Sequence, residues 1–344
     1  MKKSVTLKDI ARETGVHVST VSRALDPIGQ KMLTASVIEK VRACALRMGY
    51  RRNNLAFGLK TNRTMTIGVI IPDLTNTLFP LIVRGIESVL EARGYASIIV
   101  NTDNNADRKA KLLDVLLERG VDGIIDAAAD ISDPKMIEVF EQGLPIVTVN
   151  RAIQGSSIPS IINDDTAGMQ LLLKFLVEKG HRKIAHVAGP QFLTTGRTRL
   201  QVFENTLKDL NLTLLSDLVE ITSRFDEDEG LRATEVLLEK KLEFTALVCA
   251  NDRLAIGALE ALKKHGLKCP DDISVTGFNN LPYLRMAMPG LTTINIQKFN
   301  VGRASAELIL RSIDDPDAVI PSCTILPVQL IERGSVKPPA PAKH

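Results

Sequence analysis

From Thr66 onward, the sequence alternates between short apolar runs typical of strands and longer segments whose apolar residues recur at helical spacing. The expected strands are 66–71, 96–100, 123–125, 146–149, 183–187, 246–249 and 273–276. The expected helices are 78–93, 108–119, 134–142, 166–178, 197–210, 227–239 and 252–265. Strands that alternate with helices form parallel sheets covered on both faces, so we predict two doubly wound parallel-sheet lobes facing each other across a cleft. The 344 residues leave room for a small further domain before them.

The charge of the chain is divided unevenly along its length. Residues 1–63 contain thirteen Lys and Arg against four Asp and Glu, whereas the rest of the chain carries a small net negative charge. Lys and Arg bind polyanions because they displace the counterions condensed on phosphates. The asymmetry therefore indicates a nucleic-acid partner for the first sixty residues, with a merely solvated basic terminus as the alternative.

The basic segment has the pattern of a small all-α helix-turn-helix head. Thr6 is placed to cap a helix over 7–14, and Gly15 to end it. A second helix is expected over 18–25, and a third, capped by Thr34, to about 48. The second helix presents Val18, Ser19, Ser22 and Arg23 outward, which are residue types that reach base edges and phosphates in a major groove. Arg23 is the best candidate for a bidentate contact with guanine.

The segment that joins the head to the lobes, 49–60, is too short to be stable as an isolated helix. We expect it to be disordered until it binds a partner.

Several classes of function lack their signatures in this chain. There is no Gly-x-Gly-x-x-Gly after the first strand, no Walker loop and no Gly-x-Ser-x-Gly elbow, so we expect no enzyme, no catalytic residue and no cofactor. The four cysteines, Cys44, Cys249, Cys269 and Cys323, are far apart, which argues against a disulfide framework and a metal site. No stretch is apolar enough to be a signal core or to span a bilayer, so we expect a cytoplasmic protein that does not bind membranes.

The head carries a close resemblance to a known family. Its segments 5–11, VTLKDIA, and 15–25, GVHVSTVSRAL, resemble the signature of LacI/GalR transcriptional regulators, the lac and purine repressor type. The resemblance implies base contacts from the second helix, phosphate contacts around it, and a hinge helix in which a leucine wedges between base pairs of the minor groove. The implied DNA-binding residues are Thr6, Val18, Ser19, Thr20, Ser22, Arg23, Tyr50, Asn53, Ala56, Leu59 and Lys60.

The head also departs from the family pattern at three places. Arg52 stands where the family has a proline, Gly58 occupies a hinge-helix position, and His17 replaces the usual serine cap. Glycine lowers helix propensity by about 1 kcal/mol relative to alanine. We therefore expect weaker folding of the hinge on DNA, or more help from phosphate contacts.

The lobes resemble the sensor domain of the same family, for example at 72–76, 179–185, 250–252 and 272–278. Polar residues at strand ends, where open α/β sheets bind ligands, agree with a small-molecule site. The implied effector-binding residues are Thr75, Phe79, Asn150, Arg151, Asp164, Thr195, Arg199, Phe225, Asn251 and Asn279. Arg199 is the strongest expected charged anchor, and Phe79 and Phe225 are expected platforms against a ring.

Asn150 and Asn279 stand where the family commonly has aspartates. Asparagine donates and accepts hydrogen bonds but carries no charge. We therefore expect an effector that is neutral or anionic and carbohydrate-like, such as a sugar, sugar acid or sugar phosphate, rather than a cation.

The resemblance also implies the organisation of the chain. We expect the head at 1–49, the hinge and linker at 50–63, the two lobes at 64–335 with crossovers near 163–165, 288–293 and 323–328, and a disordered tail at 336–344. The implied function is a regulator, expected to be a repressor, that binds a near-palindromic double-stranded DNA operator as a homodimer under effector control. The alternatives are a solute-binding protein without a DNA role and an α/β sugar-metabolising enzyme.

Overall fold

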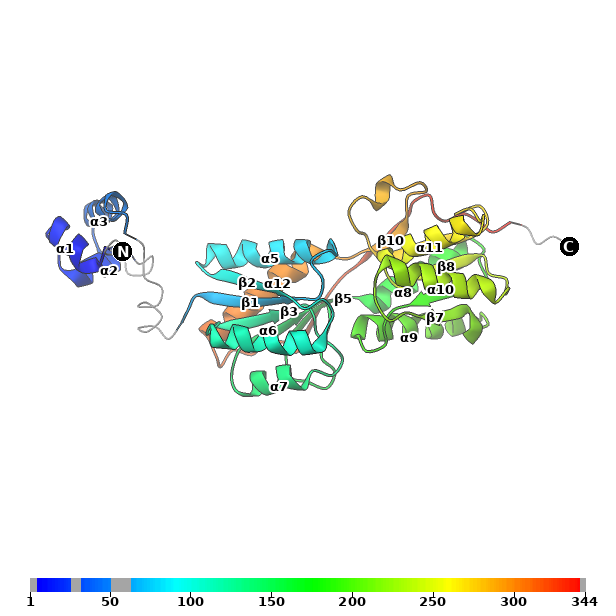
Figure 1. Cartoon of the computed structure of the whole chain (residues 1–344), viewed down its shortest axis with the longest axis horizontal. Coiled ribbons are helices and arrows are strands. Elements are labelled where there is room, and N and C mark those ends of the chain that lie inside the picture. The colour runs from blue at the N-terminus through cyan, green and yellow to red at the C-terminus, as the bar shows by residue number, and fades with distance from the viewer. Residues whose placement is uncertain (1–4, 26–31, 51–62, 341–344) are drawn as a thin grey trace. The chain divides into compact units, whose positions relative to one another are not determined.

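A computed structural model describes residues 5–25, 32–50 and 63–340, in two compact units, Met1–Thr64 and Met65–His344. The expectations for Asn53, Ala56, Leu59 and Lys60, and for Arg52 and Gly58, fall outside the described residues. Figure 1 shows the elements of both units in chain order.

The first unit contains the three expected helices, α1 (Leu7–Thr14), α2 (Val18–Ala24) and α3 (Ala35–Arg47). Each helix gives one apolar face to a common core, which contains Ile10, Val21 and Val41, all fully buried. Gly15 ends α1 in the left-handed conformation (φ 69°), which glycine adopts without steric cost. The left-handed conformation of Gly15 allows the chain to turn into α2 within a few residues.

The second unit consists of two α/β lobes, which we call lobe A and lobe B. The sheet of lobe A contains β1 (Thr66–Ile71), β2 (Ala96–Asn101), β3 (Gly123–Asp126), β4 (Ile146–Val149), β5 (Ser160–Asn163) and β11 (Cys323–Leu326). Its helices are α5 (Leu78–Ala92), α6 (Ala106–Glu118), α7 (Pro134–Glu141) and α12 (Lys298–Asp314).

The sheet of lobe B contains β6 (Ile184–Ala188), β7 (Val219–Ile221), β8 (Ala246–Cys249), β9 (Ser274–Asn279), β10 (Thr292–Asn295) and β12 (Gln329–Ile331). Its helices are α8 (Asp165–Glu178), α9 (Thr194–Asp209), α10 (Glu227–Glu239) and α11 (Asp252–Lys264), with short 3-10 turns η2 (Ser216–Leu218) and η3 (Leu284–Met286).

The strand order is β11-β5-β4-β3-β1-β2 in lobe A and β12-β10-β9-β8-β6-β7 in lobe B. The pairings are parallel, as expected, except that β12 runs antiparallel to β10, with Thr293 opposite Ile331. The edge of lobe B is therefore mixed, because the chain enters β12 directly from lobe A rather than through a helix of lobe B.

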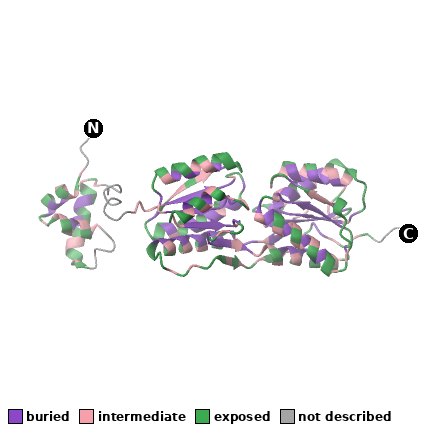
Figure 2. Cartoon of the chain, turned by 90° about the horizontal axis from the view of Figure 1, so that it is seen from below, coloured by how far each residue is buried: buried purple, intermediate pink, exposed green. Residues whose placement is uncertain are grey.

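Side chains of β1 show why the sheets are covered on both faces. Successive residues of a strand point to opposite faces. Ile67 and Val69 lie in the core that includes α5, whereas Ile70 lies in the second core with residues of α6 and α7. Figure 2 shows buried residues throughout the sheets and exposed residues on the outer faces of the helices. Because both faces of β1 are buried, the sequence of this strand has to be continuously apolar.

The chain passes between the lobes three times. The first crossover lies between β5 and α8, and the third lies between β11 and β12. The second was expected at 288–293, and this was wrong: β10 is still part of the lobe B sheet, and the chain reaches lobe A only through 296–297 before α12.

The expectation of a disordered tail from 336 was also wrong for residues 336–340. Val336 is 8% exposed, and the Lys337 carbonyl accepts hydrogen bonds from the His181 ring and the Ser274 hydroxyl. These contacts hold the segment along lobe B, since the buried polar groups of that lobe need partners.

Among the described helices, none is long and apolar enough to cross a membrane.

Candidate functional site

The first candidate site is the outward face of α2 in the head. Ser19 and Arg23 are exposed and four residues apart, so they lie on one face of the helix. Val18, Thr20 and Ser22 are half-buried beside them, while Val21 and Ala24 are buried in the core. The helix thus presents hydroxyls and one guanidinium to solvent and anchors itself through its apolar side.

The start of each of the first two helices is fixed by a side chain. Thr6 forms a capping box, in which its hydroxyl accepts from the Asp9 amide at 3.3 Å while the Asp9 carboxylate accepts from the Thr6 amide at 2.9 Å. His17 begins α2, and its Nδ1 accepts from the Ser19 amide at 3.3 Å. His17 therefore supplies the N-cap of α2, at the position where the family usually has a serine. Tyr50 is half-buried against the head core.

The second candidate site is a cavity of about 170 Å³ between the two lobes. Lobe A contributes Asp73, Asn76, Phe79 and Asp103, together with Arg151 after β4. Lobe B contributes residues of the loops after β6 and β7 and of α11, among them Phe192, Arg224, Phe225, Asp226 and Arg253. The site therefore lies at the carboxyl ends of the strands, as open α/β sheets require.

Of the ten expected effector residues, Phe79, Arg151 and Phe225 line this cavity. The Phe225 ring has a place because residue 189 is glycine: a Cβ there would lie 2.2 Å from the ring. Thr75 is exposed, and its hydroxyl donates to Asp73 at 2.7 Å. Thr195 is buried in the first turn of α9.

Arg199 is already bound within lobe B. Its Nε and Nη2 donate to Asp165 Oδ1 at 3.1 and 2.7 Å, and its Nη1 donates to the Ala250 carbonyl at 2.7 Å. The guanidinium also lies 3.8 Å from the ring centroid of Phe278. Burial raises the pKa of Asp165, although Arg199 acts in the opposite direction. Arg199 therefore orders the site and uses three of its five N–H donors within lobe B.

Asp164 and Asn251 cap helices. Asp164 accepts from the Ala167 amide at the start of α8, and Asn251 accepts from the Leu254 amide at the start of α11, both at 2.8 Å. Capping alone accounts for these two residue types at these positions.

Asn150 and Asn279 have unusual backbone conformations at the ends of β4 and β9, with φ of 68° and 111°. Both side chains are buried, and Asn279 Oδ1 has no hydrogen-bond partner within the described part of the chain. Buried polar atoms are rarely left unpaired, and residues in rare backbone conformations cluster at ligand sites. Asn279 is therefore a strong candidate to receive a donor from a ligand.

Arg151 is a buried cation of the cleft whose Nε has no hydrogen-bond partner among the described residues. It is 6% exposed, its Nε is buried, and no described atom pairs with that Nε. It shares a small second cavity with Asp130, which lies near enough to act on its charge. Burial lowers the pKa of Arg151 to about 10 and raises the pKa of Asp130. The two side chains thus offer a donor and an acceptor to the same small space.

The other charges of the cleft are paired. Arg253 binds Asp73 and Glu227, Arg224 binds Asp226, and Asp103 binds Arg108. The sequence reasoning missed Arg253, Arg224 and Phe192 as lining residues. Asp73, Asn76 and Asp103 carried a signal, since each follows a strand of lobe A.

Comparison with known proteins gives a consistent result. The profile described as "Periplasmic binding proteins and sugar binding domain of LacI family" matches residues 64–333. The chain is 29% identical over 334 residues to the HTH-type transcriptional repressor PurR of Vibrio atlanticus (strain LGP32), covering 96% of this chain and 98% of that protein. It is 30% identical over 332 residues to the ribose operon repressor of Escherichia coli (strain K12), covering 96% and 99%.

Among solved structures, the chain is similar to the lac repressor dimer bound to operator and the anti-inducer ONPF. The TM-score is 0.84 at 27% identity, and the match covers 97% of this chain and all of that one. The similarity therefore includes both the head and the lobes.

Proposed function

The chain belongs to the LacI family of transcriptional regulators, and we propose that it is a repressor whose affinity for a DNA operator is set by a neutral or anionic, carbohydrate-like effector bound between lobes A and B. It is a regulator rather than an enzyme, as are the relatives to which it is similar. A regulator of this kind acts where the chromosomal DNA lies, so the proposal includes a cytoplasmic location.

The pair Arg151 and Asp130 carries the proposal for the effector. A hydroxyl group accepts from a guanidinium and donates to a carboxylate, so a polyhydroxylated ligand satisfies both side chains at once. The remaining charges that line the cleft are all held in ion pairs, and the asparagines at 150 and 279 add none. An ammonium ligand could bind Asp130 but would be repelled by Arg151 in the same small cavity.

The head supplies the DNA contact. The α2 face with Ser19 and Arg23 is suited to the major groove, where Arg binds guanine O6 and N7. Two heads related by twofold symmetry would read a near-palindrome. The function requires that the effector bind one arrangement of the lobes better than the other, since only a difference in affinity shifts an equilibrium.

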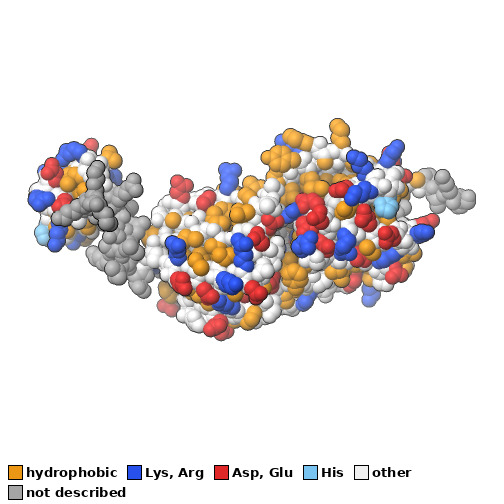
Figure 3. Space-filling model, viewed as in Figure 1, with side chains coloured by type: hydrophobic (Ala, Val, Ile, Leu, Met, Phe, Trp, Pro, Cys, Tyr) orange, Lys and Arg blue, Asp and Glu red, His pale blue; other side chains and the backbone are white. Residues whose placement is uncertain are grey.

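An exposed apolar loop of lobe B is suited to join the two copies. Tyr283, Met286 and Met288 are 73%, 67% and 100% exposed and lie within six residues. Figure 3 shows hydrophobic side chains gathered along this upper edge of lobe B. Apolar groups exposed together in this way mark protein interfaces, so we assign this loop to the homodimer.

The test combines selection and calorimetry on the full chain. Selection of bound DNA from a random pool is expected to yield a near-palindromic operator. Calorimetry then measures the binding of D-ribose, D-gluconate, D-glucose 6-phosphate and spermidine to the full chain. We expect binding of at least one of the first three and loss of that binding in Arg151→Met. Arg224→Met, whose charge is already paired in the cleft, serves as the control. Tight binding of spermidine alone would contradict the proposed effector class.

A further inference from the structure

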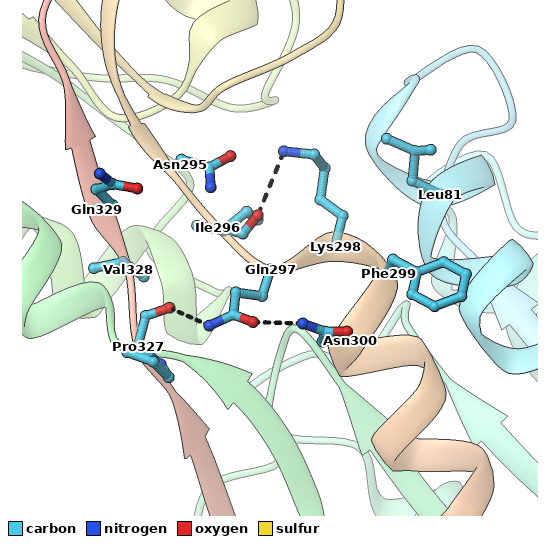
Figure 4. A pocket seen from close by; sticks show the side chains of 10 residues that line it. All are labelled: Leu81, Asn295, Ile296, Gln297, Lys298, Phe299, Asn300, Pro327, Val328 and Gln329. Carbon is cyan, nitrogen blue, oxygen red and sulfur yellow. Dashed lines mark hydrogen bonds between the residues drawn. The ribbon is translucent and has the colours of Figure 1, made fainter.

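Lys298 is a buried cation at the second crossover. It is the first residue of α12, it is 9% exposed, and it follows directly on the segment that connects lobe B to lobe A. Its Nζ donates to the backbone carbonyls of Asn279 at 2.6 Å, Asn280 at 3.1 Å and Ile296 at 3.5 Å. None of the described carboxylates lies within ion-pair distance of it. Figure 4 shows the Lys298 side chain and its hydrogen bond to Ile296.

A buried ammonium held by carbonyls is costly, because desolvation favours its neutral form. Burial lowers the pKa of Lys298 to about 8, with Asp252 acting in the opposite direction from a longer distance. An apolar side chain of similar length would fill the same space at lower cost. We therefore expect the charge of Lys298 to have a role, and that role concerns the carbonyls that its Nζ binds.

Two of those carbonyls belong to a strained segment at the end of β9. Asn279 has a φ of 111° and Asn280 a φ of 51°, both unusual for a residue with a side chain. Such conformations cost about 1 to 3 kcal/mol and persist only where surrounding contacts impose them. Lys298 supplies two of these contacts, and Asn295 and Arg333 bind the Asn280 side chain at 3.0 and 2.7 Å.

Gln297, the residue before Lys298, connects the three crossovers. The Gln297 amide donates to Asn163 Oδ1 at 3.0 Å, at the end of β5, and the Gln297 side chain donates to the Pro327 carbonyl at 3.1 Å, between β11 and β12. A cavity of about 560 Å³ borders this segment (Figure 4). The crossovers are thus tied to one another but are not packed on all sides, which leaves space for rearrangement.

We propose that Lys298 is a positioning residue that holds Asn279 in its effector-binding conformation and couples occupancy of the cleft to the crossovers between the lobes. The coupling part rests on the proposed function, whereas the positioning part does not. Because coupling is a free energy shared by two sites, removing the link reduces the effect of effector on operator affinity without removing operator binding itself.

The positioning role is tested first without any ligand. In Lys298→Met, amide hydrogen exchange of the full chain is expected to become at least tenfold faster in peptides covering 279–281 and 295–298. Exchange in β8, at the centre of lobe B, is expected to stay unchanged. Lys264→Met, on the exposed face of α11, is the matched control. Unchanged exchange at 279–281 would overturn the proposal.

The coupling role is tested with the selected operator and whichever of D-ribose, D-gluconate and D-glucose 6-phosphate binds best. We expect Lys298→Met to keep operator affinity without sugar within twofold of the parent and to reduce the sugar-dependent change at least fivefold. Lys298→Gln, which keeps a donor without the charge, should lie between the two, and it replaces the methionine variant if that variant fails to fold.

A sugar response equal to that of the parent would disprove coupling. If none of the three sugars binds the parent protein, the proposed effector class fails, and the exchange experiment still decides the role of Lys298.

Discussion

Arg253 in α11 of lobe B donates from Nη1 to Asp73 Oδ2 of lobe A at 2.8 Å, so one ion pair spans the effector cleft. Each partner is also held on its own lobe. Two bonds from Arg253 bind Glu227 at 2.8 and 2.6 Å, and Asp73 accepts from the amide and hydroxyl of Thr75. Burial alone would raise the pKa of Asp73, but the hydrogen bonds from Thr75 and Arg253 outweigh it and lower the pKa. The pair therefore stabilises the arrangement in which the two lobes meet across the cleft.

Replacing Asp73 by Asn should weaken lobe closure. A partly buried ion pair contributes on the order of 1 kcal/mol, which corresponds to about a fivefold change in an equilibrium constant. Sugar dissociation, measured by stopped flow, is expected to be about five times faster, because the closed state that retains the sugar is less populated. Asp103→Asn also changes a cleft carboxylate, but its partner Arg108 lies in the same lobe. Equal effects of the two variants would rule out a latch across the cleft.

Removing the cap of α1 should loosen the head. Thr6→Ala deletes one bond of the capping box and is expected to cost about 1 kcal/mol. Amide exchange over 7–14 in the full chain should then become about fivefold faster. Thr34→Ala is the control, because the Thr34 side chain makes no capping bond to α3. Exchange that changes equally in both variants would show that the capping box adds nothing.

Arg23 is expected to carry base specificity. Arg23→Ala should weaken binding to the selected operator by about 2 kcal/mol, or roughly thirtyfold, and relax preference at one base pair of each half-site. Arg42→Ala removes an exposed arginine from the scaffold helix α3 and should leave the base preference unchanged. Operator titrations with single-base variants measure both, and an unchanged preference in Arg23→Ala would remove this residue from base recognition.

The loop before β10 is expected to hold the dimer together. Met288→Glu places a charge on a fully exposed apolar position and should raise the dimer dissociation constant at least tenfold, because burying an unpaired carboxylate is costly. Sedimentation velocity over a concentration series measures this. Ile325→Glu changes another exposed apolar residue, in the β11 edge strand of lobe A, and should leave the dimer intact. A dimer unaffected by Met288→Glu would move the interface elsewhere.

His186 should make the lobes sensitive to acid. It is buried, stacks on Phe203 at 4.4 Å, and its Nδ1 donates to the Val248 carbonyl at 2.7 Å. Burial lowers its pKa from 6.5 to about 4, so the unfolded chain binds a proton at a higher pH than the folded one. The free energy of unfolding should therefore fall as the pH drops from about 6.5 to 4, by on the order of 3 kcal/mol from this group.

The comparison with a variant isolates this contribution. The pKa of Asp252 is raised to about 6 by burial, which makes stability fall as the pH rises from about 4 to 6 and so opposes His186 in the same range. His186→Gln keeps Asp252 but removes the histidine, so denaturant titrations should show a smaller loss toward low pH. His265→Gln, at an exposed helix end, should behave like the parent. Parallel pH profiles for all three proteins would refute the assignment.

The sequence by itself determined the local elements and their class. Gly15 and the Thr6–Asp9 pair act on residues a few positions away, so they could be read before any fold was known. The alternation of apolar runs and amphipathic segments predicted the central strands and their helices for the same reason. The short strands β5, β7, β10, β11 and β12 were not predicted, since three or four residues carry little periodicity, and the 17-residue helix α12 was not predicted either.

Tertiary structure alone decided which charges remain free for a ligand. From the sequence Arg199 was the expected anchor, but folding places Asp165 and the Ala250 carbonyl within reach of it and leaves Arg151 without a partner for its Nε. The pair between Asp73 and Arg253 joins residues 180 positions apart. Charge pairing depends on distances in space, which local patterns do not encode. The family pattern could therefore locate the cleft, but only the packed lobes decide which of its side chains are available.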